Sequence, residues 1–116
     1  MSIDPKPARR SEIRISVDLN TQKEPVGLQW HAEDAGLEAD KPARALMFSV
    51  WDPAEKSTMR IDLWTHEMTV EEMAFFMYET MAGMADTYER STGDKSMAVE
   101  IRNFARHFGK EKKVLK

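Results

Sequence analysis

Apolar and polar residues alternate along four segments in the first half of the chain, and such alternation is typical of half-buried strands. The four segments are Glu12–Leu19, 26–30, Ala45–Trp51 and Thr58–Trp64. Short polar stretches join the first to the second and the third to the fourth, which favours antiparallel hairpins. The acidic segment Ala32–Pro42, which contains Gly36, predicts a loop.

The third and fourth predicted strands have one favoured register, with Val50 opposite Met59. In this register one face of the pair is wholly apolar, with Leu46, Phe48, Val50, Met59, Ile61 and Leu63. A shift by one residue would move these side chains to the opposite face. We therefore expect this face to be buried.

Apolar residues in the second half of the chain recur every three or four positions, which predicts two amphipathic helices. Thr69 and Glu72 have the spacing of a capping box at the start of the first helix. Gly93 is predicted to end it, and Asp94 to cap a second helix that stops at Gly109. The stripes are Val70, Met73, Ala74, Met77, Met81, Met84 and Tyr88, then Met97, Ile101, Phe104 and Phe108. We expect the methionines of the first stripe to fill a core.

Strands that precede helices predict an α+β fold, with a four-stranded antiparallel sheet and two helices packed on one of its faces. The length of 116 residues predicts one domain at 11–109, between a disordered arm at 1–10 and a basic tail at 110–116. The arm and the tail carry net charges of +2 and +3, which leaves −8 on the body. We expect no nucleic-acid partner for so acidic a body.

Composition excludes several classes of protein. The chain has no cysteine, which rules out disulfides and thiolate metal sites. The first residues lack the apolar core of a secretory signal, and no apolar run is long enough to span a membrane. We therefore expect a cytoplasmic protein that has no membrane span, no metal and no cofactor.

Candidate catalytic residues are limited to Asp62 and His66, near the end of the fourth predicted strand. A carboxylate and an imidazole can form a fragment of a catalytic or metal site. No nucleophile, metalloprotease or phosphate-binding motif accompanies them, so a surface hydrogen bond is the simpler interpretation. The acidic residues of the predicted loop also lack the spacing of a calcium site. We expect no enzymatic activity.

Several large apolar side chains remain outside the predicted core. Met47, Trp51 and Trp64 lie on the outer face of the predicted sheet, beside Arg60, and Phe75 points away from the helix stripe. Tryptophan and arginine are enriched at the centres of interfaces, and exposed apolar patches mark contact sites. We predict these five residues as protein contacts in a homo-oligomer, a dimer or a tetramer. The alternative is that loops bury the tryptophans.

Four short segments carry a joint pattern: S-V-W-D-P at 49–53, R-I-D-L-W-T at 60–65, M-T-V-E-E-M at 68–73 and M-A-D-T-Y-E-R at 84–90. Together these segments resemble the GldC family of gliding motility-associated proteins of Bacteroidetes, and the likeness covers about residues 11–108. The resemblance implies a non-enzymatic accessory protein of the gliding machinery, with partners in that machinery or in the envelope. It implies no catalytic residues.

The order of strands before helices is also similar to that of the SecB export chaperone. The alternative function is therefore a chaperone or adaptor that binds exported or unfolded client proteins. This second likeness is one of topology alone, and topology does not establish function.

Overall fold

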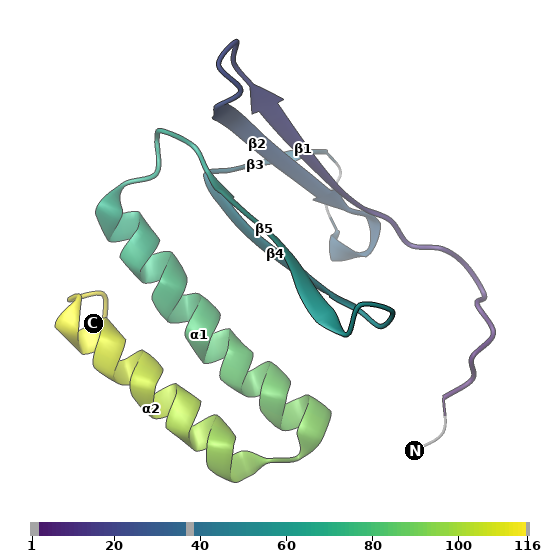
Figure 1. Cartoon of the computed structure of the whole chain (residues 1–116), viewed down its shortest axis with the longest axis vertical. Coiled ribbons are helices and arrows are strands. Elements are labelled where there is room, and N and C mark those ends of the chain that lie inside the picture. Colours follow the sequence, from purple (N-terminus) through teal and green to yellow (C-terminus); the bar gives the residue numbers. More distant parts are fainter. Residues whose placement is uncertain (1–2, 37–38, 116) are drawn as a thin grey trace. The chain divides into compact units, whose positions relative to one another are not determined.

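A computed structural model describes residues 3–36 and 39–115, and the chain divides into two compact units (Figure 1). The first unit, Met1–Glu67, contains the strands, and the second, Met68–Lys116, contains two α-helices. All strand pairs in the described residues are antiparallel. The α+β class predicted from the sequence is confirmed. The packing of the helices on a sheet face stays a prediction.

A three-stranded sheet forms in the order β1-β2-β3. Its strands are β1 (Ile13–Leu19), β2 (Pro25–Ala32) and β3 (Lys41–Ala43). Asn20 organises the β1–β2 turn, because its side-chain oxygen accepts the N–H groups of Gln22 at 2.9 Å and Glu24 at 3.0 Å. The predicted hairpin is therefore confirmed. The short strand β3 lies partly in the segment predicted as a loop, and the 3-10 helix η1 (Glu33–Ala35) precedes it.

The prediction of one four-stranded sheet was wrong, because the extended run 41–52 changes its pairing partner at Arg44. β3 pairs with β2, whereas β4 (Ala45–Asp52) pairs with β5 (Ser57–Trp64) in a separate two-stranded sheet. The β2–β3 register, continued beyond Leu28 and Ala43, would place Pro25 opposite Leu46. β2 begins at Pro25 and is therefore too short to pair with the rest of β4.

The β4–β5 hairpin has the predicted register, with Val50 opposite Met59 and Phe48 opposite Ile61. One face of the hairpin, called the apolar face below, carries Leu46, Phe48, Val50, Met59, Ile61 and Leu63. The expected burial of this face stays a prediction, as does the packing of the helices on a sheet face. The exposed fraction is 38% for Phe48 and 54% for both Met59 and Ile61.

Helix α1 (Val70–Thr92) begins and ends as the sequence predicts. The Thr69 hydroxyl accepts the N–H of Glu72 at 3.0 Å, and the Glu72 carboxylate accepts the N–H of Thr69 at 3.1 Å. This reciprocal pair is a capping box. At the other end Gly93 has a φ of 77°, and its N–H donates to the Glu89 carbonyl at 2.8 Å. Glycine suits this left-handed position because it has no Cβ.

Helix α2 (Lys95–Glu111) begins as predicted at Asp94, whose carboxylate accepts the N–H of Met97 at 3.1 Å. The predicted stop at Gly109 was wrong, since the helix continues for two residues. Lys113 adopts a φ of 59°, and the N–H of Val114 donates to the Gly109 carbonyl at 2.9 Å. With the bond from the N–H of Lys113 to the Lys110 carbonyl, this forms a Schellman motif.

Small residues form the buried seam between α1 and α2. Ala85 and Ala98 are fully buried, Ala105 is 1% exposed, and Gly109 is buried. Small side chains at a helix contact allow the two axes to approach closely. The expectation that Met84 fills a core was wrong, because 57% of it is exposed. Met97 and Phe104 of the second stripe are also exposed, at 46% and 57%.

Gly109 provides the first testable prediction. A Cβ at this position would lie 2.7 Å from Leu115 Cγ and 3.0 Å from the Tyr78 ring. We expect Gly109→Ala to lower the free energy of unfolding by about 1–3 kcal/mol because of this overpacking. Urea denaturation followed by circular dichroism measures the change.

Gly83→Ala is the matched control. Gly83 also lies inside a helix, but a Cβ there would meet nothing within 4 Å. Alanine should therefore stabilise the protein by about 0.5–1 kcal/mol, because glycine loses more backbone entropy on folding. Equal effects of the two substitutions would contradict the close approach at Gly109.

Candidate protein-contact surfaces

Four of the five predicted contact residues lie on one face of the β4–β5 hairpin. This mixed face carries Ala45, Met47, Ser49, Trp51, Thr58, Arg60, Asp62 and Trp64. Cross-strand pairing places Met47 opposite Asp62, and Trp51 opposite Thr58. The fifth residue, Phe75, lies on α1 in the other unit. The structure therefore places Met47, Trp51, Arg60 and Trp64 on one face, with Trp51 near the β4–β5 turn and Trp64 at the other end of the hairpin.

Both tryptophans of the mixed face are open to solvent. Trp51 is 65% exposed and Trp64 is 58% exposed, whereas Met47 is half-buried. The alternative that loops bury these two indoles is therefore wrong for the described chain. Tryptophan is a large, mainly apolar side chain with one N–H donor, and it is enriched at interface centres.

Arg60 and Asp62 place one positive and one negative charge two residues apart on β5. The Arg60 guanidinium contacts the Asp62 carboxylate at 3.1 Å, and the two side chains are 54% and 41% exposed. An exposed ion pair of this kind contributes only about 0–1 kcal/mol to stability. The pair matters more because it gives β5 a positive charge at Arg60 and a negative charge at Asp62.

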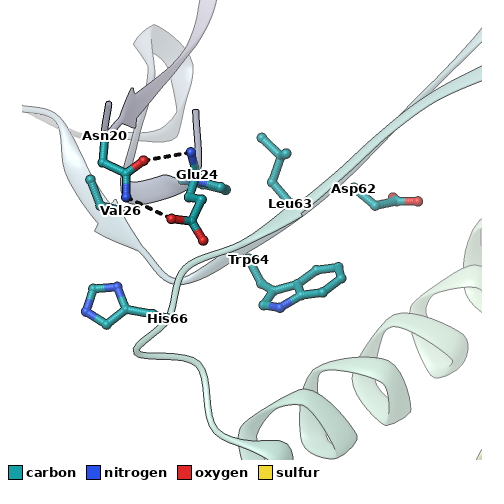
Figure 2. A pocket seen from close by; sticks show the side chains of 8 residues that line it. Asn20, Glu24, Val26, Asp62, Leu63, Trp64 and His66 are labelled. Atoms are coloured by element: carbon teal, nitrogen blue, oxygen red, sulfur yellow. Dashed lines mark hydrogen bonds between the residues drawn. The ribbon is translucent and has the colours of Figure 1, made fainter. Parts of the chain in front are cut away.

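A cavity of about 680 Å³ lies in the first unit, between the β1–β2 turn and the end of β5 (Figure 2). It is lined by Asn20, Glu24, Pro25, Val26, Asp62, Leu63, Trp64 and His66. The sequence does not predict this cavity, because the position of the β1–β2 turn relative to β5 depends on the long-range fold. The one local signal is the polar cluster around Asn20, whose side chain also donates to the Glu24 carboxylate at 3.1 Å.

Asp62 and His66 both line this cavity but do not form a pair. Figure 2 shows them on opposite sides of the end of β5. The Asp62 carboxylate is bound by Arg60, and no hydrogen bond joins it to His66 in the described residues. In residues 3–36 and 39–115, no three His, Asp or Glu side chains gather in a possible metal site. Asp62 and His66 are therefore joined only as lining residues of this cavity.

Phe75 lies in a second hollow, within the helical unit. Its exposed fraction is 42%, and its ring centroid is 6.4 Å from that of Tyr78. The hollow, of about 540 Å³, is lined by Met68, Glu71, Glu72, Phe75, Phe76, Glu79, Lys113, Val114 and Leu115. Val114 and Leu115 are half-buried there. These neighbours were not expected from the sequence, which indicated a solvated tail.

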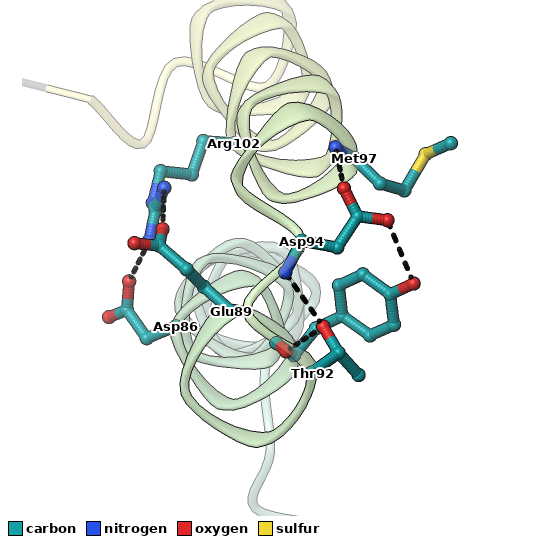
Figure 3. Close-up of polar contacts among 7 residues, drawn as sticks. Asp86, Glu89, Thr92, Asp94, Met97 and Arg102 are labelled. Carbon is teal, nitrogen blue, oxygen red and sulfur yellow. Dashed lines mark hydrogen bonds and ion pairs between the residues drawn. The ribbon is translucent and has the colours of Figure 1, made fainter.

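An ion-pair network lies on one side of the helix pair. Arg102 contacts Asp86 at 2.8 Å and Glu89 at 2.9 Å, so it links α2 to α1. The hydrogen bonds that Arg102 donates to Asp86 first, and then to Glu89, raise the pKa of its guanidinium. Figure 3 shows this network on the opposite side from Met97. This ion-pair network therefore joins the two helices on one side only.

A polar contact also ties the amino-terminal arm to η1. The Arg9 guanidinium donates to the Asp34 carboxylate at 2.8 Å. Hydrogen bonding from Ser11, and then from Arg9, lowers the pKa of the Asp34 carboxyl. All three residues are exposed, so this contact organises the surface and contributes little to stability.

The fold and its surfaces define a small α+β protein with uncovered apolar residues on a strand pair and on a helix pair. Residues 25–114 match the family described as "Gliding motility-associated protein GldC-like", and the chain belongs to this family. The predicted resemblance is thus confirmed. No curated protein and no solved structure matches the chain. Among the described residues, no helix is long and apolar enough to cross a membrane.

The exposure of the indoles gives a second prediction. We expect Trp51→Phe and Trp64→Phe each to remove a red-shifted fluorescence component that acrylamide quenches strongly. Trp30→Phe should instead remove a weakly quenched component, because Trp30 is half-buried on β2. Equal quenching of all three indoles would contradict the exposure of the mixed face.

Proposed function

We propose that this protein is a non-enzymatic accessory component of the bacterial gliding machinery that acts through protein–protein contacts on its mixed face. Membership of the GldC-like family supports the link to gliding motility. The observation that carries the contact role is the exposure of Trp51 and Trp64 on the face that also holds Arg60. Proteins of the gliding machinery or the envelope are the proposed partners.

The exposure of the two indoles favours a role in binding over a role in stabilising the folded chain. Each indole is more than half exposed, so its removal takes little buried apolar area from the folded chain. A partner that covered both would bury large aromatic surface, and such residues dominate binding energy at interfaces. Binding and stability can therefore be separated by mutation.

The third prediction tests this separation. In a gliding host whose own copy of the gene is deleted, a Trp51→Ala/Trp64→Ala variant should fail to restore colony spreading. The same variant should lose the gliding-machinery proteins that co-purify with the unmodified chain, as measured by quantitative mass spectrometry. Its unfolding free energy should change by less than about 1 kcal/mol, since exposed substitutions have small effects.

Ile13→Ala is the control for this experiment. Ile13 is an apolar residue of β1 with 73% of its surface exposed, and it lies outside the mixed face. This variant should restore spreading and retain the same co-purified proteins. Full activity of the double tryptophan variant would refute the proposed contact role.

Self-association is part of the proposal. The apolar face of β4–β5 leaves Met59 and Ile61 more than half exposed, and an isolated two-stranded hairpin is only marginally stable. A homo-oligomer, dimer or tetramer, would cover some of this surface. Its place in the cytoplasm also stays a prediction, which fractionation of host cells tests.

A chaperone for exported or unfolded clients is the second candidate. The observation that favours it is the exposure of four methionines, because methionine-rich surfaces adapt to varied partners. These are Met59, Met77, Met84 and Met97, at 54%, 37%, 57% and 46% exposed.

The fourth prediction distinguishes the two candidates. If the protein is an accessory component with defined partners, a stoichiometric excess of it leaves the aggregation of a chemically unfolded model protein unchanged. Light scattering follows the aggregation. Suppression of aggregation would instead support the chaperone.

A further inference from the structure

The outer edge of β5 is an unpaired strand edge. In the part of the chain that the structure describes, β5 pairs with β4 alone. An unpaired edge presents a row of N–H and C=O groups that can bind another strand. Proteins commonly block such edges with charged side chains, and β5 does carry Arg60 and Asp62. The arrangement of these two charges decides which partner the edge accepts.

One hydrogen bond shows which backbone N–H and C=O groups of β5 point away from β4. The N–H of Thr65 donates to the Arg44 carbonyl at 2.8 Å, and these residues continue the register of the β4–β5 ladder. Hydrogen-bonded and non-hydrogen-bonded pairs alternate along an antiparallel ladder. The outward backbone groups of β5 therefore belong to Thr58, Arg60, Asp62 and Trp64.

A second copy of β5 can pair with this edge in a two-fold register that also pairs opposite charges. Antiparallel pairing centred on Ile61 places Arg60 of each chain opposite Asp62 of the other. Both residues direct their backbone groups outward, so this pair can also exchange ladder hydrogen bonds. A centre on Arg60 or on Asp62 would instead place like charges directly opposite each other, which is destabilising. Among these three centres, the charges therefore favour the one on Ile61.

The same register joins the two apolar faces. It places Met59 of each chain opposite Leu63 of the other, and Ile61 opposite itself on the two-fold axis. All three side chains belong to the apolar face, so they would form one continuous row across the junction. Three or more strands with an apolar face are needed for an independently stable sheet, and the pairing supplies four.

We infer that two copies of this chain associate through their β5 edges, in antiparallel register about Ile61, to form a continuous β4-β5-β5-β4 sheet. This inference rests on the self-association proposed above and names its surface. Reciprocal contacts between Arg60 and Asp62 replace the contact that the two residues make within one chain. A two-fold dimer of this kind is self-complementary and closed.

The fifth prediction uses introduced cysteines, because the chain has none of its own. In the proposed dimer the two Ile61 residues form a non-hydrogen-bonded pair with Cα atoms about 4.5 Å apart, within the range of a disulfide. Under mild oxidation, Ile61→Cys should therefore convert most of the full-length protein to a covalent dimer on a non-reducing gel.

Met59→Cys is the matched control, since Met59 and Ile61 have the same exposed fraction of 54%. In the proposed register each Met59 faces Leu63 of the other chain, and the two Met59 Cα atoms lie roughly 14 Å apart. This variant should remain monomeric on the gel. Equal cross-linking of the two variants would show random collision and overturn the β5 pairing.

Charge reversal supplies an independent readout. Arg60→Asp places two carboxylates opposite each other, and Asp62→Arg places two guanidinium groups opposite each other. Each variant alone should weaken the dimer about tenfold, by analytical ultracentrifugation. An equimolar mixture of the two should recover it, as should the double reversal in one chain. Arg14→Asp, on β1, should have no effect.

These outcomes distinguish self-association in general from the specific pairing of two β5 edges. A strict monomer for the unmodified chain would overturn both self-association and the β5 pairing. An oligomer that is insensitive to charge reversal, or that the mixture does not restore, would overturn the β5 pairing alone. The contact role of the two tryptophans is tested separately by colony spreading.

Discussion

The register of β4 against β5 is the constraint on which the surface properties of this protein depend. Val50 lies opposite Met59, and because side chains alternate along a strand, this single pairing sorts the whole hairpin into two faces. One face holds the apolar row and the other holds both exposed tryptophans. The same register fixes which backbone groups point outward from β5. A slip by one residue would exchange the faces and remove each proposed contact.

Features that depend on neighbouring residues could be predicted from the sequence. The Thr69–Glu72 capping box, the left-handed Gly93 and the Asp94 cap are all present, because each is formed within one helical turn. The four main strands and both hairpins are likewise local. The candidate contact residues on β4 and β5 were placed on one face for the same reason, since strand periodicity fixes that face.

Features that depend on fit between distant segments could not be predicted. The break at Arg44 follows from the limited reach of β2, which no local pattern encodes. Hydrophobicity indicated a core made by the methionine stripes, whereas the helices meet at alanine and Gly109, where close approach decides the contact. The docking of Leu115 beside Tyr78 and the cavity beside His66 also need tertiary structure.

The change of partner at Arg44 also bears on how the chain reaches its structure. Arg44 divides the extended segment into β3 and β4. The main contacts therefore join elements that are neighbours in sequence: β1 with β2, β2 with β3, β4 with β5, and α1 with α2. Loop closure between neighbours costs little entropy, and folds with such local contacts form quickly. Each hairpin can therefore assemble as it leaves the ribosome, before the next one has been synthesised.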